Sequence, residues 1–214
     1  MSPPLQRPNI THPVLDRECG PIKVLLIGDS IVTAYAETVA ERLADIATVY
    51  RPRTNCRHTI YGRKWLLRWL NDTHWDLIHF NFGLHDLAYR NPELDTETQL
   101  DKINGKQIVP VAGYAENLEV LIRRLGEATD RLTWATTTIV PENEPGRFVS
   151  DCAAYHEAAL EVVNRHGLPV NDLRSLSQQF DEDMFVAPGD VHYTEEGYRR
   201  LGEQVATFIR GKLT

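Results

Sequence analysis

The sequence predicts a single α/β domain in which helices cover both faces of a parallel five-stranded sheet. Short apolar segments of strand length alternate with longer segments whose apolar residues recur at helical spacing. Residues 22–27 (IKVLLI) are apolar almost throughout, as expected for a strand buried on both faces. The chain has 214 residues, which is enough for one large core and short for two.

Each element follows from a local pattern. Residues 1–21 are rich in proline, and we expect an extended arm that precedes a domain spanning 22–214. We expect strands at 22–27, 47–50, 76–82, 132–138 and 168–170, where short apolar runs occur. Helices are expected where apolar residues share one helical face, at 31–43, after Gly62 around 65–70, around 118–125, at 151–165 and at 195–209.

Two further local features complete this outline. Thr194 precedes two glutamates, a pattern that predicts the N-cap of the last helix. Residues 89–113 show no clear periodicity, so we expect a loop or small hairpin that overhangs the site.

Composition and charge disfavour several classes of function. The chain is 42% hydrophobic and 25% charged, which is ordinary for a globular protein. Its net charge of −7 disfavours nucleic acid, anionic membranes and, mildly, polyanionic substrates. The three cysteines (Cys19, Cys56 and Cys152) lack Cys-x-x-Cys spacing, so we expect neither a disulfide framework nor a zinc site. No apolar run reaches membrane-span length, and no secretory leader is visible. We therefore expect a cytoplasmic protein, or a secreted or periplasmic one whose leader was removed.

Three short motifs lie where loops of such a sheet converge. Gly28-Asp29-Ser30 follows the first strand, Gly83-Leu84-His85-Asp86 follows the third, and Asp190-Val191-His192 precedes the last helix. In doubly wound sheets, ligands bind outside the carboxyl ends of the strands. A serine, an acid and a base at that edge are the components of nucleophilic acyl transfer. Taken alone, Ser30 is better explained as a helix N-cap, which is the commonest role of a serine at such a position.

Taken together, these motifs resemble the SGNH, or GDSL-type, esterase superfamily over about residues 22–210. Residues 75–87 (WDLIHFNFGLHDL) resemble a branch in which histidine replaces the usual asparagine, and whose members are similar to bacterial carbohydrate esterases, including acetylxylan esterases. The resemblance implies a flavodoxin-like three-layer sandwich. It also implies that Ser30 is the nucleophile, that His192 is the base and that Asp190 is the acid, with no metal or cofactor.

The expected oxyanion hole departs from the family at two positions. His85 replaces the asparagine, and a neutral imidazole can still donate one N–H, although it could instead only brace its loop. Arg57 stands at a glycine position, where its backbone N–H remains a donor. We therefore expect the N–H groups of Ser30 and Arg57 and the side chain of His85 to hold the oxyanion. If φ is positive there, Arg57 is strained; its guanidinium could contact substrate or solvent.

The acid also departs from the family pattern. Gly189 occupies the position three residues before His192, where aspartate is expected, and Asp190 is only two residues before it. We expect Asp190 to reach the ring of His192. The alternative is a Ser-His dyad oriented by a backbone carbonyl, and Asp183 is the next carboxylate to test.

Other polar and aromatic side chains are candidates for substrate contact. Tyr89 and Tyr193 offer an apolar ring face and a hydroxyl to a sugar, and His58 could reach the same cleft. Asp29 is a further candidate, with capping or bracing of its loop as the alternative reading. Tyr114 is a candidate of the same kind as the other two tyrosines, and His156, like His58, could reach the cleft.

The resemblance implies a serine esterase that removes O-acetyl groups from polysaccharides or oligosaccharides through an acyl-enzyme. Acetylated carbohydrate is the expected partner, with neither nucleic acid nor membrane, and a homo-oligomer is compatible with this reading. The alternatives are a lipid-ester or acyl-thioester hydrolase, a catalytically silent carbohydrate-binding module, and a phosphate-binding domain that uses the helix after Ser30.

Overall fold

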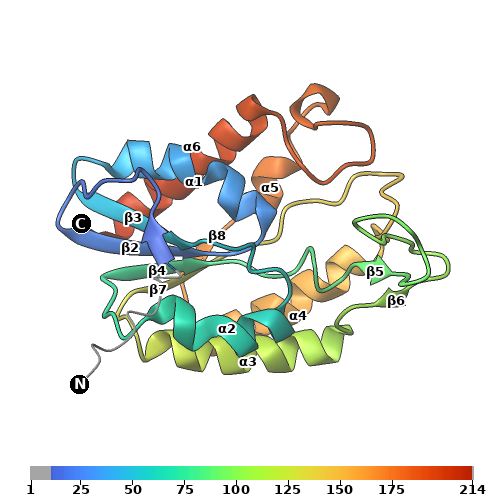
Figure 1. Ribbon diagram of the computed structural model, residues 1–214, viewed down its shortest axis with the longest axis horizontal. Coiled ribbons are helices and arrows are strands. Elements are labelled where there is room, and N and C mark those ends of the chain that lie inside the picture. Colours follow the sequence, from blue (N-terminus) through green and yellow to red (C-terminus); the bar gives the residue numbers. More distant parts are fainter. Residues whose placement is uncertain (1–10, 214) are drawn as a thin grey trace, which may run out of the picture.

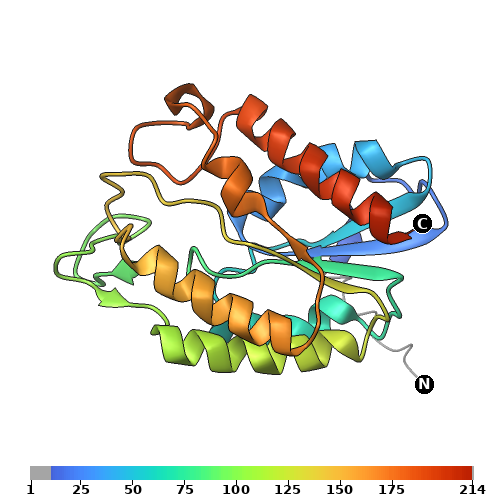
Figure 2. The ribbon, with the colours of Figure 1, turned by 180° about the vertical axis from the view of Figure 1, so that it is seen from behind.

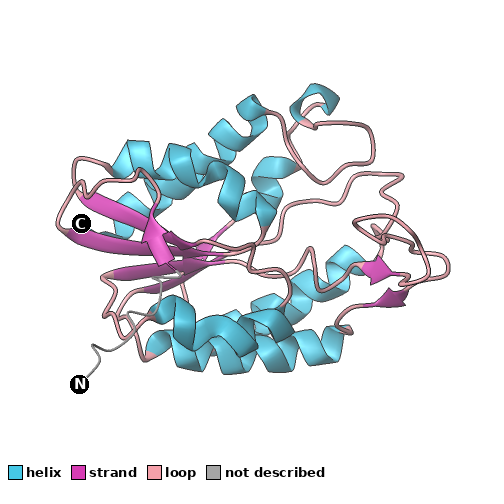
Figure 3. Ribbon diagram, in the orientation of Figure 1, coloured by secondary structure: helices cyan, strands magenta, loops and turns pink. Residues whose placement is uncertain are grey.

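Six strands form the central sheet of the computed structural model, which describes residues 11–213 (Figure 1, Figure 3). Their order across the sheet is β1-β3-β2-β4-β7-β8. Their bounds are β1 Thr11–Pro13, β2 Ile22–Ile27, β3 Ala47–Pro52, β4 Leu77–Phe80, β7 Leu132–Ala135 and β8 Val170–Asn171. Five neighbouring strands, β3, β2, β4, β7 and β8, pair in parallel, which confirms the predicted core of the sheet.

Strand β1 was not predicted. It pairs antiparallel with β3 at the edge of the sheet, with Thr11 opposite Pro52. A strand of three residues is too short to show a period-two pattern, and its prolines are tolerated because it is an edge strand. Part of the expected arm is thus built into the sheet, and residues 1–10 of that arm lie outside the described residues.

Helices cover both faces of the sheet, which confirms the three-layer sandwich (Figure 1, Figure 2). One face carries α1 (Ser30–Leu43), α5 (Leu173–Ser177) and α6 (Glu195–Leu213), and the other carries α2 (Thr59–Leu70), α3 (Val111–Gly126) and α4 (Asp151–Arg165). This division follows from right-handed crossovers: the one through α1 runs from β2 to β3 toward one edge of the sheet, and those through α2, α3 and α4 run toward the opposite edge. No helix among residues 11–213 is both long and apolar enough to cross a bilayer.

Helix α2 begins earlier than the sequence predicts. It starts at Thr59 rather than after Gly62, because the side chain of His58 accepts the N–H of Tyr61 at the first turn. Gly62 lies inside the helix, where a Cβ would approach Phe82 Cζ to 2.8 Å. Glycine is therefore required there for close packing of α2 on the chain that follows β4.

The segment 89–113 forms a small hairpin, as predicted. Its strands are β5 (Tyr89–Arg90) and β6 (Lys106–Gln107), which pair antiparallel. The hairpin lies beyond the right-hand end of the sheet in Figure 1. The N–H of Tyr89 donates to the carbonyl of Gly146 at 2.7 Å, which anchors the hairpin to the loop before α4.

Thr194 directly precedes α6, the position predicted for its N-cap, and its carbonyl accepts the N–H of Tyr198 at 2.9 Å. Its hydroxyl donates to the carbonyl of Met184 at 3.2 Å. Met184 belongs to a short 3₁₀ helix, η1 (Glu182–Met184). The threonine therefore fastens the preceding loop to the start of α6.

Candidate active site

Ser30, His192 and Asp190 form a continuous chain of hydrogen bonds at the carboxyl end of β2. The Oγ of Ser30 lies 2.9 Å from Nε2 of His192. On the other side of the ring, Nδ1 of His192 lies 2.7 Å from Oδ1 of Asp190. The side chains of His192 and Asp190 are 42% and 39% exposed, so the group is open to a substrate. A hydroxyl, an imidazole and a carboxylate in this order can activate the hydroxyl as a nucleophile.

The topology explains why these residues meet. Strand β2 lies between β3 and β4, so the chain leaves it at the point where the strand order reverses. Crevices for ligands form at such points, outside the carboxyl ends of parallel strands. Ser30 opens α1 after the two residues that follow β2, and the loop before α6 returns His192 to the same edge.

Gly189 allows the carboxylate of Asp190 to reach the ring of His192, although only Val191 separates the two residues. It has a φ of 77°, in the left-handed region that favours glycine, and a Cβ there would approach the carbonyl oxygen of Asn143 to 2.9 Å. The N–H of Asp190 donates to the carbonyl of Ala187 at 3.1 Å, which closes the turn. The carboxylate is thereby placed beside the ring of His192, whereas no hydrogen bond joins Asp183 to that ring among the described residues.

Asp29 does not contact substrate, so that prediction is wrong. Asp29 is only 1% exposed, and its Oδ1 accepts the N–H of Ile31 at 3.0 Å as the N-cap of α1. Burial raises the pKa of Asp29 above its usual value. Asp29 therefore has the alternative role that the sequence allowed, the N-cap of α1.

His85 follows β4 and is largely buried in a neutral form. Burial, followed by the charges of Arg147 and Arg90, lowers its pKa to about 3. Its Nδ1 is buried and has no hydrogen-bond partner among residues 11–213. A neutral imidazole carries one N–H, so His85 can donate a single hydrogen bond to a group outside the ring.

The loop that contains Arg57 lies beside the loop that carries Ser30. The N–H of Cys56 donates to the carbonyl of Gly28 at 3.0 Å, which joins the two loops. Arg57 has a φ of 54°, as anticipated for a glycine position, and its guanidinium lies 5.2 Å from the centre of the Tyr61 ring. Its backbone N–H, however, donates to Oδ1 of Asn55 at 2.8 Å. The N–H has one proton, so in this conformation it is not a free oxyanion donor and that prediction needs correction.

The aromatic candidates occupy different environments. Tyr193 is 1% exposed and packs on Phe180 and Phe185, so its predicted contact with substrate is wrong. Tyr114 is likewise buried and donates to the carbonyl of Phe82 at 2.8 Å. These rings stabilise the core because their apolar faces are enclosed on all sides.

The remaining candidates are half-buried. Tyr89 donates its hydroxyl to Oδ2 of Asp151 at 3.0 Å and packs edge-on against Phe148. His58 caps α2, and its pKa is lowered by burial and by the charges of Arg57 and Arg90. His156 lies on α4, and Nδ1 of its ring has no partner among the described residues. Of these three residues, His58 is the one whose pKa is lowered by the same arginines, Arg57 and Arg90, that lower the pKa of His85.

Buried contacts of Arg147 and Asp86 support the site. Nε of Arg147 donates to the carbonyl of Leu84 at 2.6 Å, and its guanidinium pairs with Glu144, with both side chains buried. Oδ1 of Asp86 accepts the N–H of Thr59 at 2.9 Å and also the Thr59 hydroxyl. These contacts join the loop after β4 to α2 and to the loop before α4. Asn55 and Arg147 lie in aperiodic loops, which explains why sequence patterns miss them.

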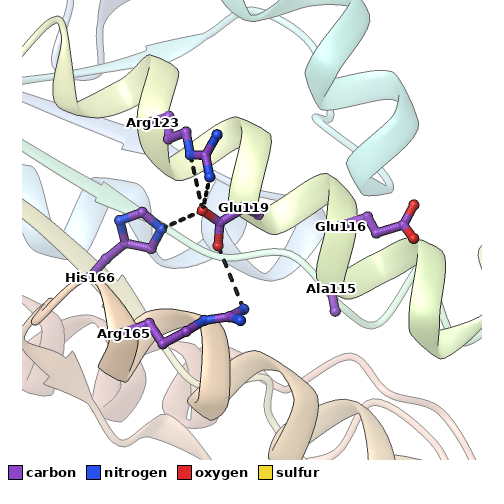
Figure 4. Close-up of a pocket in the computed structure, with 6 residues that line it drawn as sticks. All are labelled: Ala115, Glu116, Glu119, Arg123, Arg165 and His166. Carbon is purple, nitrogen blue, oxygen red and sulfur yellow. Dashed lines mark hydrogen bonds and ion pairs between the residues drawn. The ribbon is translucent and has the colours of Figure 1, made fainter.

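A separate hollow between α3 and α4 has a different character. Figure 4 shows the carboxylate of Glu119 bound by Arg123, Arg165 and His166. These charges satisfy one another, and no nucleophilic side chain lies among them. The hollow is therefore a surface ion-pair network and not a second candidate for acyl transfer.

The comparisons with known proteins agree on one family. The model of the GDSL-like lipase/acylhydrolase family matches residues 26–200. Among solved structures, a lipase/acylhydrolase from Enterococcus faecalis is similar with a TM-score of 0.72 at 24% identity, covering 90% of this chain and 97% of that one. The acetyl xylan esterase AlAXEase matches with a TM-score of 0.69 at 14% identity, covering 88% and 100%.

A third solved structure extends this agreement. The acetylxylan esterase Axe2 from Geobacillus stearothermophilus matches with a TM-score of 0.66 at 15% identity, covering 88% of this chain and 94% of that one. Among curated protein sequences, none matches the chain. At these identities the structural likenesses establish the fold, while the family model covers most of the chain, including all three motifs.

Proposed function

Because the chain belongs to the GDSL-like lipase/acylhydrolase family, and is thereby a hydrolase of carboxylic esters, we propose that it removes O-acetyl groups from polysaccharides or oligosaccharides. The observation that carries the mechanism is the hydrogen-bond chain from Ser30 through His192 to Asp190. Its order and distances are those that nucleophilic catalysis by serine requires.

The proposed reaction has two steps. His192 takes the proton from the hydroxyl of Ser30 as its Oγ attacks the acetyl carbonyl, and the same proton then passes to the departing sugar hydroxyl. Asp190 orients the ring and stabilises the imidazolium that forms. Water, activated by His192, then hydrolyses the acyl-enzyme and releases acetate.

The oxyanion is held by two groups in this proposal. Ser30 is the first residue of α1, where N–H groups lack helical partners and the helix dipole favours negative charge. His85 provides an N–H from a ring that stays neutral because its pKa is about 3. Donors aimed at the developing charge contribute a large part of the rate acceleration in acyl transfer.

A cavity of about 10 Å³ lies near the start of α1, lined by residues that include Ile31, Val32 and Leu84. Its volume is comparable to that of a single water molecule, and neither Ser30 nor His192 lines it, so it carries no argument about the length of the acyl group. Acetylxylan esterases of the same fold support the carbohydrate part of the proposal, and catalytic mutants of one of them replace a serine and a histidine.

Acetate release from a panel of acetylated glycans tests the proposal, with Ser30→Ala as the inactive control. We expect acetate from at least one glycan and slow turnover of octanoyl model esters relative to acetyl ones. Faster cleavage of octanoyl esters would instead identify a lipid-ester hydrolase. Failure of an organophosphonate to label Ser30 would indicate a catalytically silent module.

A further inference from the structure

Three arginines gather beside the loop that carries His85. We call Arg57, Arg90 and Arg147 the arginine corner. The positive charges of all three lower the pKa of His85, and those of Arg57 and Arg90 also lower the pKa of His58. Hydrogen bonds place all three near the site. Nε of Arg147 donates to the carbonyl of Leu84, the residue before His85, the N–H of Tyr89 beside Arg90 donates to the carbonyl of Gly146 beside Arg147, and the N–H of Cys56 beside Arg57 donates to the carbonyl of Gly28.

Among the described residues, only one of the three guanidinium groups has a counter-charge. Arg147 pairs with Glu144 and donates to the carbonyl of Leu84, so its charge is used to brace the loop. The side chain of Arg90 makes no hydrogen bond or ion pair with any residue in the described part of the chain, and its Nε is buried. Leaving a buried guanidinium nitrogen without an acceptor is costly, which indicates an acceptor that comes from outside the chain.

The geometry of the hairpin keeps the side chain of Arg90 away from the carboxylate of Asp151. Arg90 follows Tyr89 on β5, and successive side chains of a strand point to opposite faces. Tyr89 is the residue that contacts Asp151, so Asp151 lies on the other face. Directly opposite Arg90 on β6 is Lys106, a second cation, and like charges at such a position are destabilising.

Arg57 adds a second unpaired charge. No ion pair joins its guanidinium to a carboxylate within residues 11–213, and its contact is with the face of the Tyr61 ring. Its backbone is held at a φ of 54°, where a side chain other than that of glycine is strained. A strained residue beside a reaction site is an indication of function. The guanidinium is the feature that distinguishes Arg57 from the glycine expected at this position.

We propose that Arg90, assisted by Arg57, binds a carboxylate on the substrate, so that the preferred substrates are acetyl esters of acidic sugars such as uronic acid residues. This inference rests on the proposed function, because it names the substrate class of the same site. An arginine recognises a carboxylate through two parallel N–H donors, which a neutral sugar cannot match. The net charge of −7 opposes such a substrate only over distances that salt screens.

The test compares two substrates that differ only in charge. They are an acetylated methyl glucuronoside and its C6 amide, which share the same sugar and the same ester. We expect kcat/KM of the wild-type chain to be about 10- to 100-fold higher for the acid, as for a charge-assisted hydrogen bond. Arg90→Gln should reduce this ratio to about one, Arg57→Gln should reduce it in part, and added salt should lower it in the wild type.

A matched control and a binding measurement keep the two proposals separate. Arg123→Gln removes a distant arginine on α3 and should leave the acid-to-amide ratio unchanged. Equal kcat/KM for acid and amide in an active wild-type enzyme would overturn the acidic-sugar inference alone. An unchanged ratio in Arg90→Gln, with its fold verified by circular dichroism, would overturn the role of Arg90.

If no acetyl ester is cleaved, p-nitrophenyl acetate included, the proposed function fails, and binding still decides the inference. Calorimetry on Ser30→Ala would then compare methyl glucuronoside with methyl glucoside. Tighter binding of the glucuronoside that is lost in the Ser30→Ala, Arg90→Gln double variant supports the carboxylate site. Equal or absent binding of the two sugars overturns it.

Discussion

Oδ1 of Asp190 accepts two hydrogen bonds from His192, one from ring Nδ1 at 2.7 Å and one from the backbone N–H at 2.9 Å. The backbone bond holds the carboxylate in place while the ring bond directs Nε2 toward Ser30. Two residues separated only by Val191 thereby form the acid–base pair for which a spacing of three residues is expected from the family resemblance. Tests of the site therefore begin with this pair.

Asp190→Asn should lower kcat by about 10⁴, because an amide keeps the shape but can leave the wrong ring nitrogen of His192 protonated. The measurement is the turnover of p-nitrophenyl acetate. Asp183→Asn is the matched control and should be nearly silent. A loss of less than about tenfold at Asp190 would indicate a Ser-His dyad in place of the triad.

Ser30→Ala and His192→Ala should each lower kcat by at least about 10³ to 10⁴, since only binding and the oxyanion donors remain. The double variant should lose little more than either single variant, because the two residues act as a unit. Steady-state kinetics on acetyl esters check both statements. Retention of a tenth of the activity in Ser30→Ala would exclude the serine mechanism.

His85→Ala should lower kcat by about 10² to 10³ with little change in KM, as expected for loss of a donor that acts in the transition state. His85→Asn should recover part of the rate, since its amide is also a neutral donor. The pKa of His85 is about 3, so neither variant should shift the pH–rate profile above about pH 5. A change in melting temperature alone, at normal kcat, would show that His85 only braces its loop.

Asp86 should make stability decrease as the pH rises. Burial raises the pKa of its carboxyl from 3.8 to about 7, so between these values the native state holds a proton that the unfolded state has lost. The resulting loss of stability grows across this window to on the order of 4 kcal/mol above about pH 7. Asp86→Asn lacks this pH dependence because an amide does not titrate in this range. Its carbonyl oxygen can still accept the N–H of Thr59, so the variant keeps that contact.

Urea denaturation at pH 5 and at pH 8 checks this prediction. The stability of Asp86→Asn relative to the wild type should increase from the lower to the higher pH. Asp183→Asn lies on the surface and should show no such trend. An equal difference in unfolding free energy between Asp86→Asn and the wild type at pH 5 and at pH 8 would mean that the Asp86 carboxyl titrates outside this range.

Arg57→Gly should be more stable than Arg57→Ala by about 1 kcal/mol, because only glycine adopts a φ of 54° without strain. Both variants lose the contact with the Tyr61 ring, so their comparison isolates the backbone. Thermal unfolding of the two variants measures the difference. Equal stability would show that the loop relaxes to another conformation when the arginine is removed.

The sequence by itself determined the α/β architecture and much of the catalytic chain. Apolar periodicity is a local property, so it identified α1, α4 and the five parallel strands close to their observed bounds. Ser30 and His192 belong to short motifs, and the topology implied by alternating strands and helices places both at one sheet edge. Asp190 was accessible to the same reasoning because it lies only two residues from His192.

The tertiary structure alone decided which side chains are buried and which donors are free. Asp29 and Tyr193 were candidates for substrate contact by residue type, but packing encloses both of them. Asn55 accepts the N–H of Arg57. The arginine corner is assembled from two loops, which carry Arg57 and Arg147, and from the two-residue strand β5, which carries Arg90, and none of these segments has a periodic pattern. Hydrogen-bond partners and charge clusters depend on distances between residues that are tens of positions apart. Those distances are set by how the layers pack, which no local pattern encodes.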